Sequence, residues 1–231
     1  MPTTILPATT PQDFHAISSL ENRVFYYDPF TVVAFGPTRA SEDNIAKRAQ
    51  GLAKKPRNEG GREVVMMAMD EKAVVIGGAA WSFIVAGGKE VGKEADGRKE
   101  EMEEGDDSWG FGANVRFCED VFLAADEHML RSCEGRGYAK LSTMIVAPEN
   151  QRRGIGSQLL EKGLREVDEA GLQCVLAASK EGLELYKRFG FVEYETMSLK
   201  LWEYEGGEGL GEDRHVVMHR PAKERVQNAA L

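Results

Sequence analysis

The sequence predicts one α/β (α+β) domain in which a mixed, mostly antiparallel central sheet is flanked by helices. Segments with strand-like and helix-like hydrophobic spacing alternate along the chain. Two strand-like segments, residues 63–69 and 73–85, are joined by a tight turn and form a predicted central hairpin. The chain has 231 residues, 42% of them hydrophobic, which is enough to bury a core. We therefore expect residues 1–231 to form a single domain.

The first half of the chain is expected to contain three strands and two helices. Pro11 opens the first helix, whose apolar residues recur at the spacing of one helical face. Ser41 caps the second helix, and acidic residues occupy its first turn, where the helix dipole favours them. Besides the two strands of the hairpin, a short strand is expected at residues 3–9.

The second half is expected to alternate between helices and strands. Helical periodicity covers residues 119–133, and an amphipathic helix begins near Gly154 and ends at Gly171. A short helix is expected at residues 181–189. The strands of this half are expected at residues 138–146, 174–178, 191–199 and 215–219.

Two segments rich in glycine and acidic residues are expected to be surface loops. Residues 87–110 contain six glycines and few apolar side chains, so we expect a flexible acidic insertion there. Residues 203–214 form a second acidic, glycine-rich loop. The net charges of the two segments are −5 and −4, which together equal the charge of −9 on the whole chain. The overall charge therefore describes these loops, and the remaining framework is neutral.

Composition argues against several classes of protein. With 29 Lys plus Arg against 38 Asp plus Glu, a generally basic nucleic-acid-binding protein is not expected. Cys118, Cys133 and Cys174 are odd in number and lack metal-ligand spacing, so we expect reduced thiols and no metal site. The N-terminus lacks the features of a secretory signal, and the longest uncharged run, residues 73–88, is shorter than the roughly 20 residues of a membrane span. We expect a cytoplasmic protein with no membrane partner; a nuclear location stays open.

One stretch combines a strand, a glycine-containing loop and the start of a helix. Backbone N–H groups at a helix start are unpaired and carry partial positive charge, so they bind phosphate. Gly154 and Gly156 allow close approach of a phosphate, and Arg152 and Arg153 add positive charge. The stretch predicts a diphosphate ligand; a glycine-containing loop that merely begins a helix is the alternative.

Two common nucleotide-binding motifs do not fit this stretch. A nucleotide P-loop has Lys followed by Ser or Thr after its second glycine, where this chain has Ser157 and Gln158. A dinucleotide-binding fingerprint has a third glycine where Leu159 stands.

A closer match is the acetyl-CoA loop of the GNAT superfamily of N-acetyltransferases, whose motif is Gln/Arg-x-x-Gly-x-Gly/Ala. Residues 151–156, Gln-Arg-Arg-Gly-Ile-Gly, resemble that loop and follow a strand that ends in Val-x-Pro. The family's Tyr-x-x-x-Gly-Phe motif resembles residues 186–191. Both motifs occur in the family's order, and the resemblance is strongest over residues 138–200.

The resemblance implies the GNAT fold, in which a splayed pair of strands holds acetyl-CoA, the acetyl donor. It implies that Tyr186 is the general acid that protonates the departing thiolate, since a tyrosine of pKa about 10 is protonated at neutral pH. Ser179 stands where many relatives carry Asn. The residues implied to bind the cofactor are Met144, Ile145, Val146, Gln151, Arg152, Arg153, Gly154, Ile155, Gly156, Ser157, Ser179 and Tyr186.

The general base has no assignment from the sequence. Many relatives place Glu or Asp on the strand before the loop, but residues 138–144 contain no carboxylate. The upstream candidates are Glu119, Asp120, Glu127 and His128, and a chain of water molecules is an equal alternative.

The resemblance also implies that residues 21–35, a segment connecting the first helices, help to select the acceptor. This segment contains an aromatic cluster with one acid, which could bind a cationic or aromatic amine or belong to the core. The cluster consists of Phe25, Tyr26, Tyr27, Asp28 and Phe30.

The predicted function is direct transfer of acetyl from acetyl-CoA to a primary amine of a small molecule or peptide. Two alternatives stay open. One is an acyl-CoA-binding module without catalysis. The other is a transferase that uses another acyl-CoA as donor, or a protein N-terminus as acceptor. A homodimer is compatible with the sequence.

Overall fold

The computed structural model describes residues 3–56, 58–87 and 107–223. Most of the expected acidic insertion, residues 88–106, lies outside the described residues. The strands are β1 (Thr4–Pro7), β2 (Arg62–Met69), β3 (Val75–Ile84), β4 (Tyr138–Val146), β5 (Gln173–Ala178), β6 (Val192–Lys200) and β7 (Glu212–Arg220).

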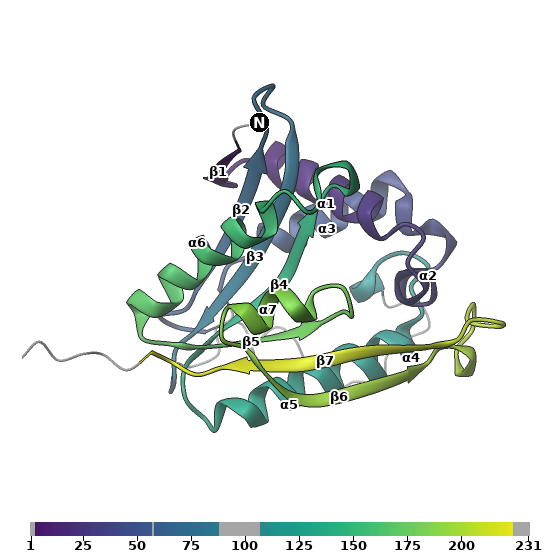
Figure 1. Ribbon diagram of the computed structural model, residues 1–231. Helices are drawn as coiled ribbons and strands as arrows, with labels where there is room; N and C mark the ends of the chain where they lie inside the picture. Colours follow the sequence, from purple (N-terminus) through teal and green to yellow (C-terminus); the bar gives the residue numbers. More distant parts are fainter. Residues whose placement is uncertain (1–2, 57, 88–106, 224–231) are drawn as a thin grey trace, which may run out of the picture.

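These strands form one seven-stranded sheet in the order β1-β2-β3-β4-β5-β7-β6 (Figure 1). Every neighbouring pair is antiparallel except β4 and β5, which run parallel. The predicted fold class, a mixed and mostly antiparallel sheet flanked by helices, is confirmed. β7 begins at Glu212, earlier than the sequence pattern predicts, because Glu212 to Arg214 pair with the end of β6.

Helices cover both faces of the sheet. They are α1 (Pro11–Phe25), α2 (Pro29–Phe35), α3 (Glu42–Leu52), α4 (Val115–Cys118), α5 (Ala124–Cys133), α6 (Ile155–Ala170) and α7 (Leu183–Arg188). A π-helical turn, Glu119–Leu123, connects α4 to α5. The sequence pattern predicts one helix from residue 119, but the helical segment begins at Val115, where the Asn114 side chain accepts a hydrogen bond from the N–H of Phe117.

Local sequence explains where the first helices begin. Thr10 and Asp13 form a reciprocal capping box at the start of α1, and the Ser41 side chain accepts from the N–H of Asn44 at the start of α3, as predicted. α2 is not among the expected helices, although Asp28 caps it and Pro29 is its first residue. The segment expected to connect the first helices is therefore itself partly helical.

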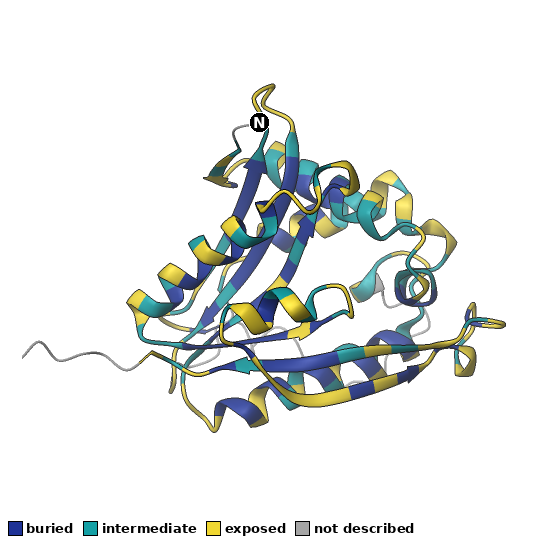
Figure 2. Ribbon diagram, viewed as in Figure 1, coloured by how far each residue is buried: buried dark blue, intermediate teal, exposed yellow. Residues whose placement is uncertain are grey.

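The two faces of the sheet bury separate apolar clusters. α6 and α7 cover one face, which we call the α6 face; α1, α3 and α5 cover the opposite face, the α1 face (Figure 1). Trp81 and Leu159 are fully buried in the cluster beneath α6, whereas Ile17 and Val217 belong to clusters on the α1 face. The central strands are buried along most of their length (Figure 2).

A bulge in β4 exchanges the faces on which its side chains lie. Trp81 pairs with Leu141 and Ala80 pairs with Thr143, so Ser142 is an extra residue in β4. Leu141 therefore packs under α6, but Ile145, four residues later, packs on the α1 face. The extra residue thus determines which side chains lie on each face of the sheet near the C-terminal end of β4.

Close contact between α6 and the sheet depends on Gly163. A Cβ atom at this position would lie 2.2 Å from Cζ2 of Trp81, which has no exposed surface. We expect Gly163→Ala to lower the free energy of unfolding by about 1–3 kcal/mol through overpacking. This loss should occur even though Ala is favoured over Gly within a helix by about 1 kcal/mol.

Urea denaturation measures this effect, and Gly51→Ala is the matched control. Gly51 lies in α3, and a Cβ atom there would meet nothing within 4 Å. The control should raise the free energy of unfolding by about 0.5 kcal/mol. Equal changes in the two variants would refute the close packing of α6 against Trp81.

Candidate functional site

The parallel strands β4 and β5 separate part of the way along their length. Their pairing covers Tyr138 to Lys140 of β4 and Gln173 to Val175 of β5. Both strands continue, to Val146 and to Ala178, without pairing to each other. A gap bordered by backbone hydrogen-bonding groups therefore opens between the strands, and we call it the β4–β5 gap.

Backbone groups of Met144 and Val146 face this gap. The N–H of Ala147 donates to the carbonyl oxygen of Ile76 on β3 at 2.9 Å, and successive residues of a strand direct their groups to opposite sides. Ile145 accordingly faces β3, and its side chain is buried on the α1 face. The carbonyl oxygen of Val146 accepts a hydrogen bond from Nε2 of Gln151 at 3.1 Å. The predicted residues Met144 and Val146 thus border the gap, whereas Ile145 packs behind it.

The loop after β4 leads into an uncapped helix start. Gly154 has φ +82° and Arg152 has φ +60°, so the chain takes left-handed conformations immediately before α6. No side chain caps α6, and the N–H groups of residues 152–157 have no acceptor among the described residues. Arg152 and Arg153 are exposed beside these groups. Successive free N–H groups at a helix start, next to two cations, form an anion-binding site.

The glycines of this loop differ in what they require. Position 154 requires a residue that tolerates a positive φ. At position 156, by contrast, a Cβ atom would meet Leu185 at 3.5 Å, which is an ordinary contact. Ile155, the first residue of α6, is buried against the sheet, and Ser157 is half-buried in the first turn of the helix. The loop therefore packs firmly on one side and exposes its N–H groups on the other.

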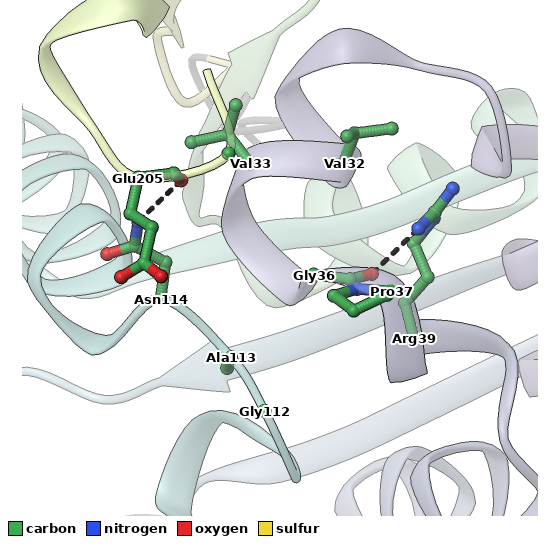
Figure 3. A pocket seen from close by; sticks show the side chains of 10 residues that line it. Val32, Val33, Gly36, Pro37, Arg39, Gly112, Ala113, Asn114 and Glu205 are labelled. Atoms are coloured by element: carbon green, nitrogen blue, oxygen red, sulfur yellow. Dashed lines mark hydrogen bonds between the residues drawn. The ribbon is translucent and has the colours of Figure 1, made fainter. Parts of the chain in front are cut away.

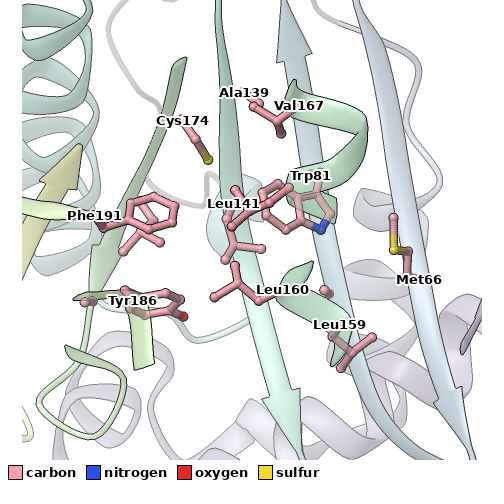
Figure 4. Packing of buried hydrophobic residues seen from close by; sticks show 14 of the residues in the cluster. Met66, Trp81, Ala139, Leu141, Leu159, Leu160, Val167, Cys174, Tyr186 and Phe191 are labelled. Carbon is pink, nitrogen blue, oxygen red and sulfur yellow. The ribbon is translucent and has the colours of Figure 1, made fainter. Parts of the chain in front are cut away.

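Tyr186 lies on α7, on the α6 face of the sheet. Its ring meets Phe191 edge-on at 5.8 Å between centroids, and the two side chains lie together beside Leu160 (Figure 4). The ring also packs against Gly182, where a Cβ atom would lie 2.7 Å from Cε2 of Tyr186. Burial raises the pKa of the Tyr186 phenol well above its usual value, so the phenol is held in its protonated form.

Ser179 follows β5 and is half-buried. Its carbonyl oxygen accepts the N–H of Gly182 at 3.1 Å, which shapes the turn into α7. Ser179 and Tyr186 are therefore brought to the same connection, between the end of β5 and α7.

The residues considered as general bases lie on the π-helical turn and on α5. Asp120 accepts a hydrogen bond from the Tyr204 hydroxyl at 3.1 Å, and His128 lies 3.9 Å from Glu195 on β6. Glu119 is half-buried and Glu127 is exposed. These contacts direct Asp120 and His128 toward β6 and the loop after it, and they single out no proton acceptor.

A polar cluster that the sequence analysis missed lies on the α1 face next to the bulge. Arg48 of α3 and Glu21 of α1 form a two-point ion pair, and both contact the hydroxyl of Thr143 on β4. Burial by itself raises the pKa of Glu21, but Arg48 and the hydrogen bonds outweigh burial and hold the pKa below its usual value. Glu21 is therefore a carboxylate bound by a cation. The available signal in the sequence was a pair of hydroxyl side chains, Ser142 and Thr143, within a mostly apolar strand.

A cavity of about 340 Å³ lies beyond the C-terminus of α2 (Figure 3). Val33 of α2, Ala113 and Glu205 contribute to its walls, and Nδ2 of Asn114 donates to the carbonyl oxygen of Glu205 at 3.1 Å. Arg39 also lines the cavity, but its guanidinium donates to the carbonyl oxygens of Tyr26 and Gly36.

The aromatic cluster expected to select the acceptor is divided between core and surface. Phe30 is buried in contact with Phe117 and stacks on His215 of β7 at 4.4 Å. Tyr27 is 87% exposed and meets Tyr26 edge-on. Phe25 and Tyr26 are half-buried, so Tyr27 is the exposed aromatic side chain of this cluster.

The described residues contain neither a metal-binding cluster nor a helix that could span a membrane. No group of His, Cys, Asp or Glu within the described ranges is arranged to hold a metal ion. Among the helices that the structure describes, none is long and apolar enough to cross a membrane.

Comparison with known proteins identifies a GNAT domain within the chain. The family model described as "Acetyltransferase (GNAT) domain" matches residues 112–193, which include β4, the α6 loop and α7. An uncharacterized N-acetyltransferase of Methanocaldococcus jannaschii is 31% identical over 80 residues, which are 33% of this chain and 35% of that protein. The aligned region thus spans about a third of the length of this curated relative.

Solved structures share the fold over nearly the whole chain. A histone acetyltransferase and related acetyltransferase from Corynebacterium glutamicum has a TM-score of 0.58 at 18% identity, covering 98% of this chain and 99% of that one. Mosquito arylalkylamine N-acetyltransferase like 5b has a TM-score of 0.62 at 16% identity, covering 95% and 99%. The diverging strands and the uncapped start of α6 lie within the matched region, and residues 112–193 are thereby identified as a GNAT acetyltransferase domain.

Proposed function

We propose that this protein transfers the acetyl group of acetyl-CoA to a primary amine of a small molecule or peptide. The observation that carries the proposal is the row of N–H groups at residues 152–157, which have no acceptor among the described residues and lie beside the β4–β5 gap. A diphosphate fits the helix start, and the extended pantetheine arm of acetyl-CoA fits between strands that no longer pair with each other. Acetyl-CoA supplies the activated thioester, and the protein supplies binding, orientation and charge stabilisation.

The start of α6 would hold the diphosphate. The N–H groups from Arg152 to Ser157 donate to phosphate oxygens, and the guanidinium groups of Arg152 and Arg153 balance the negative charge. Gln151 keeps the loop against β4 through its bond to Val146. These contacts would hold the diphosphate end of the ligand.

The edge of β4 would orient the reacting carbonyl. The backbone of Met144 and Val146 faces the gap, so an N–H from this pair can pair with the arm or donate to the thioester oxygen. A fixed donor aimed at that oxygen stabilises the charge that develops there during attack. Ile145 supports this edge from behind through its buried side chain.

Tyr186 would act on the departing sulfur. The phenol is protonated, and it donates its proton toward the sulfur that receives the electron pair of the breaking carbon–sulfur bond. The amine arrives as an ammonium ion at neutral pH and must lose a proton before it attacks. In the balanced reaction, the amine and the thioester give an amide and a free thiol, and one proton goes to solvent.

The acceptor would approach from the α1 face. α6 and α7 cover the other face at this level, with Tyr186 among their buried side chains. Attack and departure then take place on opposite sides of the sheet edge, which keeps the acceptor away from the thiol-protonating group.

Tyr186→Phe tests the role of the phenol. The variant removes one hydroxyl from a packed ring, so we expect turnover to fall by about 100-fold while the affinity for acetyl-CoA changes little. Free-thiol release measures turnover, and calorimetry measures affinity. Because the pKa of Tyr186 is raised, the wild-type enzyme should show no loss of turnover from this group as the pH rises to about 10.

The matched control is Tyr194→Phe, the same chemical change at a side chain that is 47% exposed on β6. Its turnover should equal that of the wild type. Full turnover in Tyr186→Phe would exclude the phenol from the mechanism.

Gly154→Ala tests the diphosphate site. An alanine at φ +82° costs about 1–2 kcal/mol, so the loop should relax and turn its N–H groups away from the ligand. We expect the dissociation constant for acetyl-CoA to rise about tenfold. Gly135→Ala is the matched control, since Gly135 also has a positive φ, +72°, a Cβ atom there would meet nothing within 4 Å, and the residue lies after α5, outside the α6 start. If both variants bound acetyl-CoA as tightly as the wild type, the α6 start would not be the diphosphate site.

A further inference from the structure

Three polar side chains on the α1 face form a closed set of contacts, which we call the β4 cluster: Glu21, Arg48 and Thr143. Arg48 donates from Nε to Oε2 of Glu21 at 2.6 Å and from Nη2 to Oε1 at 2.9 Å. The same Nη2 lies 2.7 Å from Oγ1 of Thr143, whose hydroxyl donates to Glu21 at 3.0 Å. Two helices thus hold one hydroxyl of the sheet.

The cluster is more than a surface ion pair. The Glu21 side chain is 18% exposed and Thr143 is 8% exposed, so both are largely shielded from water. Every member contacts both others, and the members come from α1, α3 and β4. Charge-assisted hydrogen bonds of this kind are shorter and stronger than neutral ones.

Thr143 is the first residue after the bulge. The extra residue Ser142 interrupts the ladder between β3 and β4, and its hydroxyl donates to the carbonyl oxygen of Ala80 at 3.2 Å. On its other edge, β4 no longer pairs with β5 at this point, because the pairing of the two strands ends at Lys140. The Thr143 side chain therefore anchors β4 where its backbone has one neighbouring strand and a disrupted register.

The register of β4 at this point determines which backbone N–H and carbonyl groups face the β4–β5 gap. If β4 lost the extra residue and slipped by one position, every later residue would change sides. The backbone groups of Met144 and Val146 would then face β3 instead of the gap, and Ile145 would leave its pocket on the α1 face. A bond that exists only in the bulged register therefore protects the proposed arm-binding edge.

We propose that the β4 cluster is a positioning device, in which Glu21 and Arg48 hold Thr143 and thereby keep the bulged register that aims the groups of Met144 and Val146 into the β4–β5 gap. In this role the three residues act through the backbone of β4 and not through the reacting atoms. The inference rests on the proposed function, because it assigns the cluster to the half of the acetyl-CoA site that holds the arm.

Two probes separate the two halves of that site. Acetyl-CoA carries the arm, whereas 3′-phosphoadenosine 5′-diphosphate carries the diphosphate but no arm. Thr143→Val removes the hydroxyl, keeps the branched shape and leaves Glu21 and Arg48 paired. We expect this variant to bind acetyl-CoA about tenfold more weakly, the loss typical of a hydrogen bond to charged groups, while its affinity for the armless probe stays unchanged. Thr143→Ser, which restores a hydroxyl, should recover most of the acetyl-CoA affinity.

The matched control is Glu42→Gln. Glu42 lies 2.7 Å from His15 and joins α1 to α3 without touching β4, and both side chains are exposed. This control should bind both probes as the wild type does. If Glu42→Gln and Thr143→Val weakened acetyl-CoA binding equally, the effect would come from general loosening of α1 and α3, and the proposal would be overturned. Equal weakening of both probes in Thr143→Val, or unchanged binding of both, would also overturn it.

Amide hydrogen exchange keeps this test independent of the proposed function. In Thr143→Val, exchange at residues 142–146 should be faster than in the wild type and in Glu42→Gln, with no bound ligand required. Unchanged exchange there would refute the positioning role. Failure of the wild-type protein to bind acetyl-CoA would instead refute the proposed function, so the two failures are distinguishable.

Discussion

The arrangement of the site depends on one constraint: β4 must leave β5 while it remains attached to β3. Pairing between β4 and β5 ends at Lys140, and the extra residue Ser142 follows almost immediately. Separation opens a gap, and the bulge changes the groups that face it. Neither feature alone would present the backbone of Met144 and Val146 to an extended ligand.

The two faces of the sheet divide the chemistry. On the α6 face, an apolar cluster buries Tyr186 and holds its phenol protonated. On the α1 face, the β4 cluster holds a carboxylate in its charged form beside the bulge. One face therefore keeps the proposed proton donor protonated, and the other holds the side of β4 that the proposed acceptor would approach.

Local signals in the sequence predict much of the framework. Pro11, Ser41 and Gly171 mark helix ends that the structure contains, because caps and left-handed glycines act within a few residues. The start of α6 is readable for the same reason. Asp28 before Pro29 is an equally local signal for α2, but the aromatic residues around it do not show helical spacing long enough to predict a helix.

The bulge and the β4 cluster could not be predicted in this way. Thr143 meets Arg48 and Glu21 across separations of 95 and 122 residues, and Ser142 is recognisable as an extra residue only once β3 is paired with β4. These features depend on which strands and helices pack together in the folded protein. The spacing of residues along the chain does not predict that packing. The general base belongs to the same category, because the contacts of Asp120 and His128 are set by β6 and its following loop.

The most direct test of the central claim is the release of free thiol from acetyl-CoA by the wild-type protein over a panel of primary amines. The account predicts thiol release that requires both the protein and at least one amine of the panel. Absence of release with every amine, together with no binding of acetyl-CoA at about 1 mM, the upper end of ordinary enzyme affinities, would contradict it.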